Sequence, residues 1–133
     1  MVQTRPSDLS TDIIVLVPEG RLDAQAAPSV DRQLSTLERQ GQTQVIVDCS
    51  RVRYISSSGL RVLLVHSRSQ KKAGGDLKLC CLTDKVADVL RITGLNSVLA
   101  LYDSEEDAAR AFLVAASESV AACAQGMAPD TAT

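Results

Sequence analysis

The sequence has few aromatic residues, which make up 2% of its 133 positions, and it has no tryptophan. The aromatic residues are Tyr54, Tyr102 and Phe112. Proteins that bind single-stranded nucleic acid stack bases on several aromatic faces, and a phosphate backbone is bound by clustered Lys and Arg. Here the net charge is −2 and the basic residues are scattered. We therefore expect no nucleic-acid partner and a core built from aliphatic side chains.

Long apolar runs are also missing. No stretch reaches the roughly 18 consecutive apolar residues that span a bilayer. The segment 1–6 lacks the apolar stretch of a secretory signal. We expect no membrane partner and a cytoplasmic location.

The cysteines Cys49, Cys80, Cys81 and Cys123 lack the C-x-x-C spacing typical of zinc sites. Cys80 and Cys81 are adjacent, so in a strand their side chains would point to opposite faces. We therefore predict free thiols in a reducing compartment and no metal site. A phosphate-binding G-x-x-x-x-G-K-[ST] loop is also absent, and we predict no cofactor.

Segments typical of strands alternate with segments typical of helices. Strands are expected at 13–17, 45–47, 77–80 and 98–102, with a weaker one at 1–4. Residues 52–55 are interpreted as a loop with apolar anchors. Helices are expected from about 28, 60, 83 and 104 onward, with Asp103 or Ser104 as the cap of the last one. This alternation predicts an α/β domain with a mixed or largely parallel sheet.

The segment 45–60 places three serines and a glycine between a strand and a helix. A serine at the start of a helix lies near backbone N–H groups that have no helical partner. The same position favours a phosphate, because the N-terminus of a helix carries partial positive charge. Phosphorylation there would add roughly −1.5 to −2 charges to any surface formed by the helix. Simple helix capping is the alternative interpretation.

A hydrolase nucleophile in a G-x-S-x-G turn would also lie between a strand and a helix. Here glycine follows Ser57 but does not precede it at the required position. The single histidine, His66, lies in the same expected helix and cannot easily reach back to act as a base. We interpret His66 as a surface or partly buried residue and predict that the protein is not an enzyme.

Several segments, taken in order from Ile13 to Phe112, carry a family resemblance. They are Gly20–Ala24, Asp48–Leu64, Gly74–Leu77, Thr93–Leu95 and Tyr102–Glu106. The second segment is similar to a motif with two parts. The first part is Asp-Leu-Ser, and the second is an aromatic residue followed by Ile/Met-Asp-Ser-Ser/Thr-Gly-Leu. The set resembles STAS domains of the anti-sigma-factor antagonist type. Ser56 departs from the motif, because the family has an acidic residue there.

The resemblance implies a fold. We expect one STAS-like α/β domain over residues 1–124, and we expect a disordered tail over 125–133. The domain would have a small mixed central sheet of about four to five strands. About four helices would pack mainly on one side of that sheet.

The resemblance also implies partner switching. The unphosphorylated protein would bind an anti-sigma factor that is also a serine kinase, phosphorylation would end binding, and a PP2C-type phosphatase would restore it. By position the acceptor is Ser57, with Ser58 as the second candidate. A STAS interaction module in another signalling complex, such as a kinase and phosphatase cascade or a transporter, is the alternative.

The same resemblance implies a docking surface around the acceptor. Its expected members are Asp23, Ser56, Ser58, Gly59 and Leu60. We expect Gly59 to permit a tight turn that gives a kinase room to approach. The protein itself is expected to be a monomer or a weak dimer.

Overall fold

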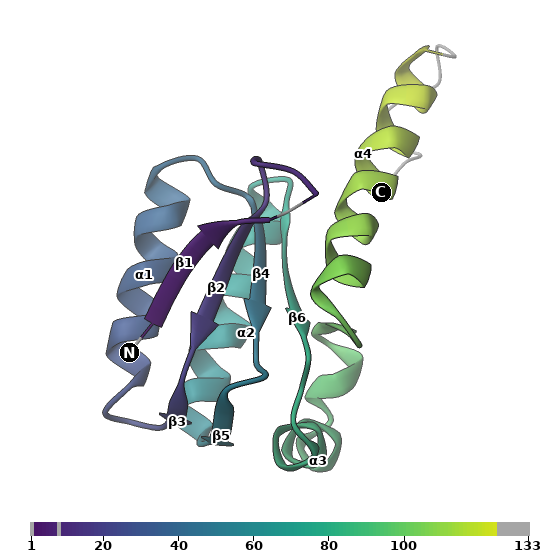
Figure 1. Ribbon diagram of the computed structural model, residues 1–133. Coiled ribbons are helices and arrows are strands. Elements are labelled where there is room, and N and C mark those ends of the chain that lie inside the picture. The colour runs from purple at the N-terminus through teal and green to yellow at the C-terminus, as the bar shows by residue number, and fades with distance from the viewer. Residues whose placement is uncertain (1, 8, 125–133) are drawn as a thin grey trace.

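A five-stranded mixed sheet forms the centre of the molecule in the computed structural model, which describes residues 2–7 and 9–124 (Figure 1). The strands run in the spatial order β1 (Val2–Pro6), β2 (Ile14–Pro18), β4 (Gln44–Asp48), β6 (Asp76–Cys80) and β7 (Ala100–Tyr102). β1 is antiparallel to β2, and the other neighbours are parallel. The predicted mixed sheet is confirmed, and the carboxyl ends of its parallel strands share one edge.

Helices cover both faces of this sheet, with most of them on one side. α1 (Ala27–Arg39), α2 (Ser57–Lys72) and α3 (Asp84–Thr93) contribute to the cluster on one face. α4 (Glu105–Ala124) packs on the opposite face, and its C-terminal half projects past the sheet (Figure 1). Helix packing mainly on one side is therefore confirmed. Within the described ranges, no helix has the length and apolar character needed to cross a membrane.

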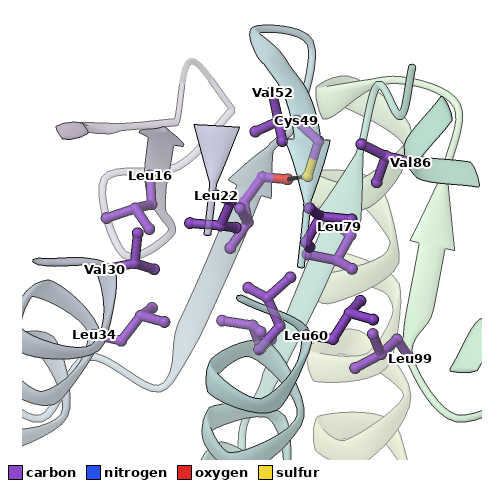
Figure 2. Packing of buried hydrophobic residues seen from close by; sticks show 14 of the residues in the cluster. Leu16, Leu22, Val30, Leu34, Cys49, Val52, Leu60, Leu79, Val86 and Leu99 are labelled. Atoms are coloured by element: carbon purple, nitrogen blue, oxygen red, sulfur yellow. Dashed lines mark hydrogen bonds between the residues drawn. The ribbon is translucent and has the colours of Figure 1, made fainter. Parts of the chain in front are cut away.

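The two faces bury separate hydrophobic clusters because side chains alternate along a strand. Along β4, Val45 and Val47 point toward the larger cluster, whereas Ile46 points toward α4. Figure 2 shows the larger cluster, in which Leu34 of α1 and Leu60 of α2 approach the sheet from the same side. Aliphatic side chains dominate both clusters, as the scarcity of aromatic residues predicts.

A second, two-stranded sheet was not predicted. β3 (Gly20–Leu22) and β5 (Val52–Ile55) pair in parallel at the end of the domain where α2 begins (Figure 1). The interpretation of 52–55 as a loop is therefore wrong. Val52 and Ile55 are buried while the two residues between them are exposed, so the segment lacks the strict alternation of a half-buried strand.

The structure moves one predicted boundary and distinguishes between two predicted caps. The last strand begins at Ala100, because a 3₁₀ turn occupies Leu95–Ser97 before it. The cap of α4 is Ser104, whose Oγ accepts a hydrogen bond from the Asp107 N–H at 3.1 Å. The predicted tail, 125–133, lies outside the described residues.

Candidate functional site

The first turn of α2 is fixed by Ser56, which is the N-cap and has extended backbone angles. The Ser56 Oγ accepts a hydrogen bond from the Gly59 N–H at 3.4 Å. The Ser56 Oγ also donates to the Leu22 carbonyl at 3.4 Å, and its N–H donates to the same oxygen at 3.0 Å. These contacts tie the start of α2 to β3. Ser56 is half-buried, and its hydroxyl is occupied by capping.

Ser57 is the first residue of α2, and it is exposed. Ser58 follows it and is half-buried. Both line a surface depression of about 480 Å³ between α1 and α2, together with Asp31 and Arg61. The depression thus presents two hydroxyls, one carboxylate and one guanidinium at the N-terminus of a helix, where backbone dipoles favour an anion.

Gly59 and Leu60 lie beneath this surface. A Cβ on Gly59 would stand 2.5 Å from the Leu22 carbonyl oxygen, which is backbone and cannot yield easily. Gly59 is therefore required for close packing of α2 against β3. Because Gly59 is buried, its position does not support the expected role of giving a kinase room to approach. Leu60 is 7% exposed and belongs to the larger core cluster. Its predicted place on an exposed docking surface is wrong, because its side chain points into the core (Figure 2).

Asp23 follows β3, the strand that pairs with the segment leading to Ser56. Leu22 pairs with Ile55 between β3 and β5, so Asp23 and Ser56 follow at neighbouring strand ends. The Asp23 Oδ1 accepts a hydrogen bond from the Ala26 N–H at 3.3 Å. The pKa of Asp23 is lowered from its usual value, mainly because this backbone hydrogen bond stabilises the carboxylate. Asp23 therefore stabilises the turn that leads into α1, and its role in partner binding stays a prediction.

His66 is more buried than the sequence indicates. It is 4% exposed, its Nε2 lies 2.6 Å from Asp31 Oδ1, and its Nδ1 lies 2.6 Å from Glu38 Oε2. Ser69 Oγ donates to Glu38 Oε1 at 3.2 Å. These side chains connect α2 to α1. The seven-residue separation of Asp31 and Glu38, two turns of one helix, is the sequence signal that places both carboxylates on one face.

The position of His66 also bears on chemistry at the serines. Both of its ring nitrogens face carboxylates of α1, so neither is directed at Ser57. A nucleophilic serine needs a base within hydrogen-bonding reach. His66 does not serve as that base. The Ser57 side chain is left exposed at the start of α2.

Cys80 and Cys81 do not point to opposite faces, and this expectation is wrong. Cys81 has φ of 60°, so the chain leaves the extended strand conformation there. As a result Asp48, Cys80 and Cys81 each offer a donor atom, and these atoms all lie within 4.8 Å of one another. We call this group the thiol cluster.

Comparisons with known proteins bear on the family and the fold of the chain. The protein-family model of the STAS domain matches residues 6–108 of this chain. BtrV of Bordetella bronchiseptica, provisionally named an anti-sigma factor antagonist, is 32% identical over 103 residues, covering 77% of this chain and 89% of BtrV. The anti-sigma-B factor antagonist of Bacillus subtilis is 31% identical over 87 residues, covering 65% and 79% of the two chains. The structure of Bacillus SpoIIAA in its phosphorylated form has the same fold, with a TM-score of 0.62 at 23% identity, covering 82% of this chain and 99% of that one.

Proposed function

Because this chain belongs to the STAS domain family, we propose that it is an anti-sigma-factor antagonist that changes partners through reversible phosphorylation of Ser57. The observation that carries the proposal is the exposed Ser57 hydroxyl on the first residue of α2. The names of the relatives support the class of function, and the phosphorylated form of a protein with this fold supports the kind of switch.

The choice of Ser57 follows from the surroundings of the three serines. The Ser56 hydroxyl caps the helix and bonds to β3, so its modification would disrupt the fold locally. Ser58 is half-buried, whereas Ser57 is exposed. A kinase needs access to the hydroxyl, and Ser57 provides the most. Ser58 is the second candidate, because it lines the same depression.

A phosphate on Ser57 would change the docking surface while leaving the core intact. The helix N-terminus tolerates the added charge of roughly −1.5 to −2. Arg61 lines the same depression and offers a cation near the phosphate, whereas Asp31 offers a like charge. A partner whose surface fits the neutral hydroxyl would have to desolvate the charged phosphate and bury it near Asp31, which is costly. Phosphorylation therefore releases the partner.

The proposed partners are an anti-sigma factor with serine kinase activity and a PP2C-type phosphatase, all in the cytoplasm. The protein would act by binding, as a monomer or weak dimer, and would catalyse no reaction. The proposed docking surface comprises Asp23, Ser57, Ser58 and Arg61, and Ser56 holds the turn beneath it in place. Gly59 and Leu60 act from below, by packing.

Peptide mass spectrometry on the chain recovered from its native cell, before and after phosphatase treatment, tests the acceptor. We expect a removable phosphate on Ser57 that is lost in S57A and kept in the matched variant S58A. Phosphate on Ser58 alone would move the acceptor by one residue. Absence from both residues in several growth conditions would leave a constitutive STAS interaction module in another signalling complex.

Affinity measurements test the release step. The unmodified chain and its Ser57-phosphorylated form would be titrated against anti-sigma-factor kinases of the same organism. We expect phosphorylation to weaken binding by about 100-fold or more, the equivalent of about 3 kcal/mol, and S57D to weaken it only in part because aspartate carries less charge. Equal affinity of the phosphorylated and unmodified chains would refute the switch.

A further inference from the structure

The thiol cluster lies at the carboxyl edge of the sheet, on the side covered by α4. Asp48 and Cys80 are the last residues of β4 and β6, and they are paired in register. Residues paired in this way point to the same face of a sheet. Cys80 belongs to the cluster under α4, and Cys81 packs against that same cluster. Two strands therefore deliver three potential ligands to one place.

The backbone at Cys81 is what completes the group. A φ of 60° is uncommon for a residue other than glycine and is found mostly where the surrounding structure holds it. The Cys81 N–H donates to the Tyr102 carbonyl at 3.3 Å, which fixes the chain as it leaves β6. This conformation allows two adjacent cysteines to direct their sulfurs to the same side.

The Asp48 carboxylate is oriented as well. Its Oδ1 accepts a hydrogen bond from the Ser50 N–H at 2.9 Å. Hydrogen bonds of this kind orient the carboxylates that bind metals. Asp48 and Cys81 are half-buried, and Cys80 is fully buried. The cluster is thus reachable from solvent on one side and enclosed by protein on the other.

Cys49 does not belong to this group. Its Sγ donates to the Val47 carbonyl at 3.7 Å, and its side chain lies in the larger cluster on the opposite face of the sheet (Figure 2). The candidate ligands are therefore two sulfurs and one carboxylate oxygen.

We propose that Asp48, Cys80 and Cys81 bind a single Zn²⁺ ion. Two thiolates and a carboxylate suit zinc, which is held by four ligands in a tetrahedral arrangement. The fourth position would be taken by water, as in zinc sites that keep one position open. Binding would release the protons of both thiols to solvent, because thiolate is the form that binds metal. Side-chain rotation must bring the sulfurs to about 2.3 Å from the ion.

The consequence would be a cross-link between the ends of β4 and β6. β4 continues through a short turn into β5, and β5 leads directly to the cap of α2. Zinc would thus fix the base of the segment that carries the exposed Ser57. The site itself is independent of the proposed phosphorylation switch, and each can fail without the other.

Zinc affinity of the full, reduced chain, measured without oxygen by competition with a chromophoric chelator, tests this proposal. The variants are C81S and D48N, and the matched control is C123S, which removes a thiol outside the cluster residues. We expect one Zn²⁺ per chain, a loss of about 100-fold in affinity for C81S and about 10-fold for D48N, and no change for C123S. Substitution with Co²⁺ should give a thiolate-to-cobalt charge-transfer band that C81S reduces.

Two results would overturn the proposal. One is binding too weak to compete with the chelator in the wild-type chain. The other is binding that C81S and D48N leave unchanged. Because Cys80 is fully buried, C80S risks disturbing the fold, so C81S and D48N carry the test. Circular dichroism of each variant confirms that the chain compared is folded.

Discussion

The two polar segments of α2 differ in what their side chains do. In the first turn, Ser56–Ser58 lie at or near the surface, and Ser56 bonds to backbone groups. Further along, His66, Ser67 and Gln70 are buried. His66 lies between two carboxylates of α1, and Gln70 Nε2 donates to the Gln42 carbonyl. The first segment is open to another protein, whereas the second is occupied by this one.

This difference separates function from stability within one helix. A polar side chain that is buried and paired stabilises the packing of α2 on α1. Its removal would leave its hydrogen-bond partner buried and unpaired, which is costly. A polar side chain that is exposed contributes little to stability and is available for modification. Substitutions in the buried segment should therefore lower stability, whereas substitutions of exposed residues in the first segment should affect modification and leave stability nearly unchanged. Variants in the two segments should thus differ in the free energy of unfolding.

The largest effect is expected at Gly59, where the first turn touches the core. G59A places a Cβ 2.5 Å from the Leu22 carbonyl oxygen, so α2 must shift away from β3. We expect a loss of about 3 kcal/mol in the free energy of unfolding, the upper end of ordinary overpacking. Urea unfolding followed by circular dichroism measures it, with R61A, an exposed position two residues on, as the control. A loss no greater than that of R61A would show that the close approach is relaxed in solution.

The next effect is expected at His66. H66A removes contacts of 2.6 Å to Asp31 and to Glu38 and leaves a cavity between α1 and α2. Loss of hydrogen bonds to charged groups predicts a decrease of about 2 kcal/mol in the free energy of unfolding. The matched control is R68A, which removes an exposed side chain from the same helix. If both variants unfold at the same urea concentration, the buried segment contributes nothing to helix pairing.

Local patterns predicted the parts of the fold that depend on few neighbours. The continuous apolar run 45–47 predicted a strand buried on both faces, and β4 is that strand. Pro28 and the apolar spacing of Val30, Leu34 and Leu37 predicted α1. The three apolar residues lie on its buried face. The serines at the start of a helix also followed from sequence, because capping is a local property, although α2 begins at Ser57 and not at about residue 60 as predicted, with Ser56 as its cap.

Pairings between distant segments were not predictable in this way. β5 exists because it pairs with β3, more than thirty residues earlier. The burial of His66 depends on carboxylates that are 28 and 35 positions away. The φ of Cys81 depends on how β6 ends beside β7. The burial of Leu60 also depends on distant segments, because the sequence of the helix does not show which of its faces packs against the sheet.

The smallest effects distinguish two neighbouring hydroxyls in the first turn of α2. S56A removes the N-cap and should lower the free energy of unfolding by about 1 kcal/mol. S57A removes an exposed hydroxyl and should leave it unchanged within about 0.5 kcal/mol. Urea unfolding of both variants measures the difference.

The same pair should show the reverse order in phosphorylation, where S57A abolishes the acceptor and S56A retains it. Loss of stability in S57A equal to that in S56A would mean that Ser57 shares the capping role. Its exposed hydroxyl would then be part of the fold as well as of the proposed switch, and phosphorylation would have to break a structural contact before it could release a partner.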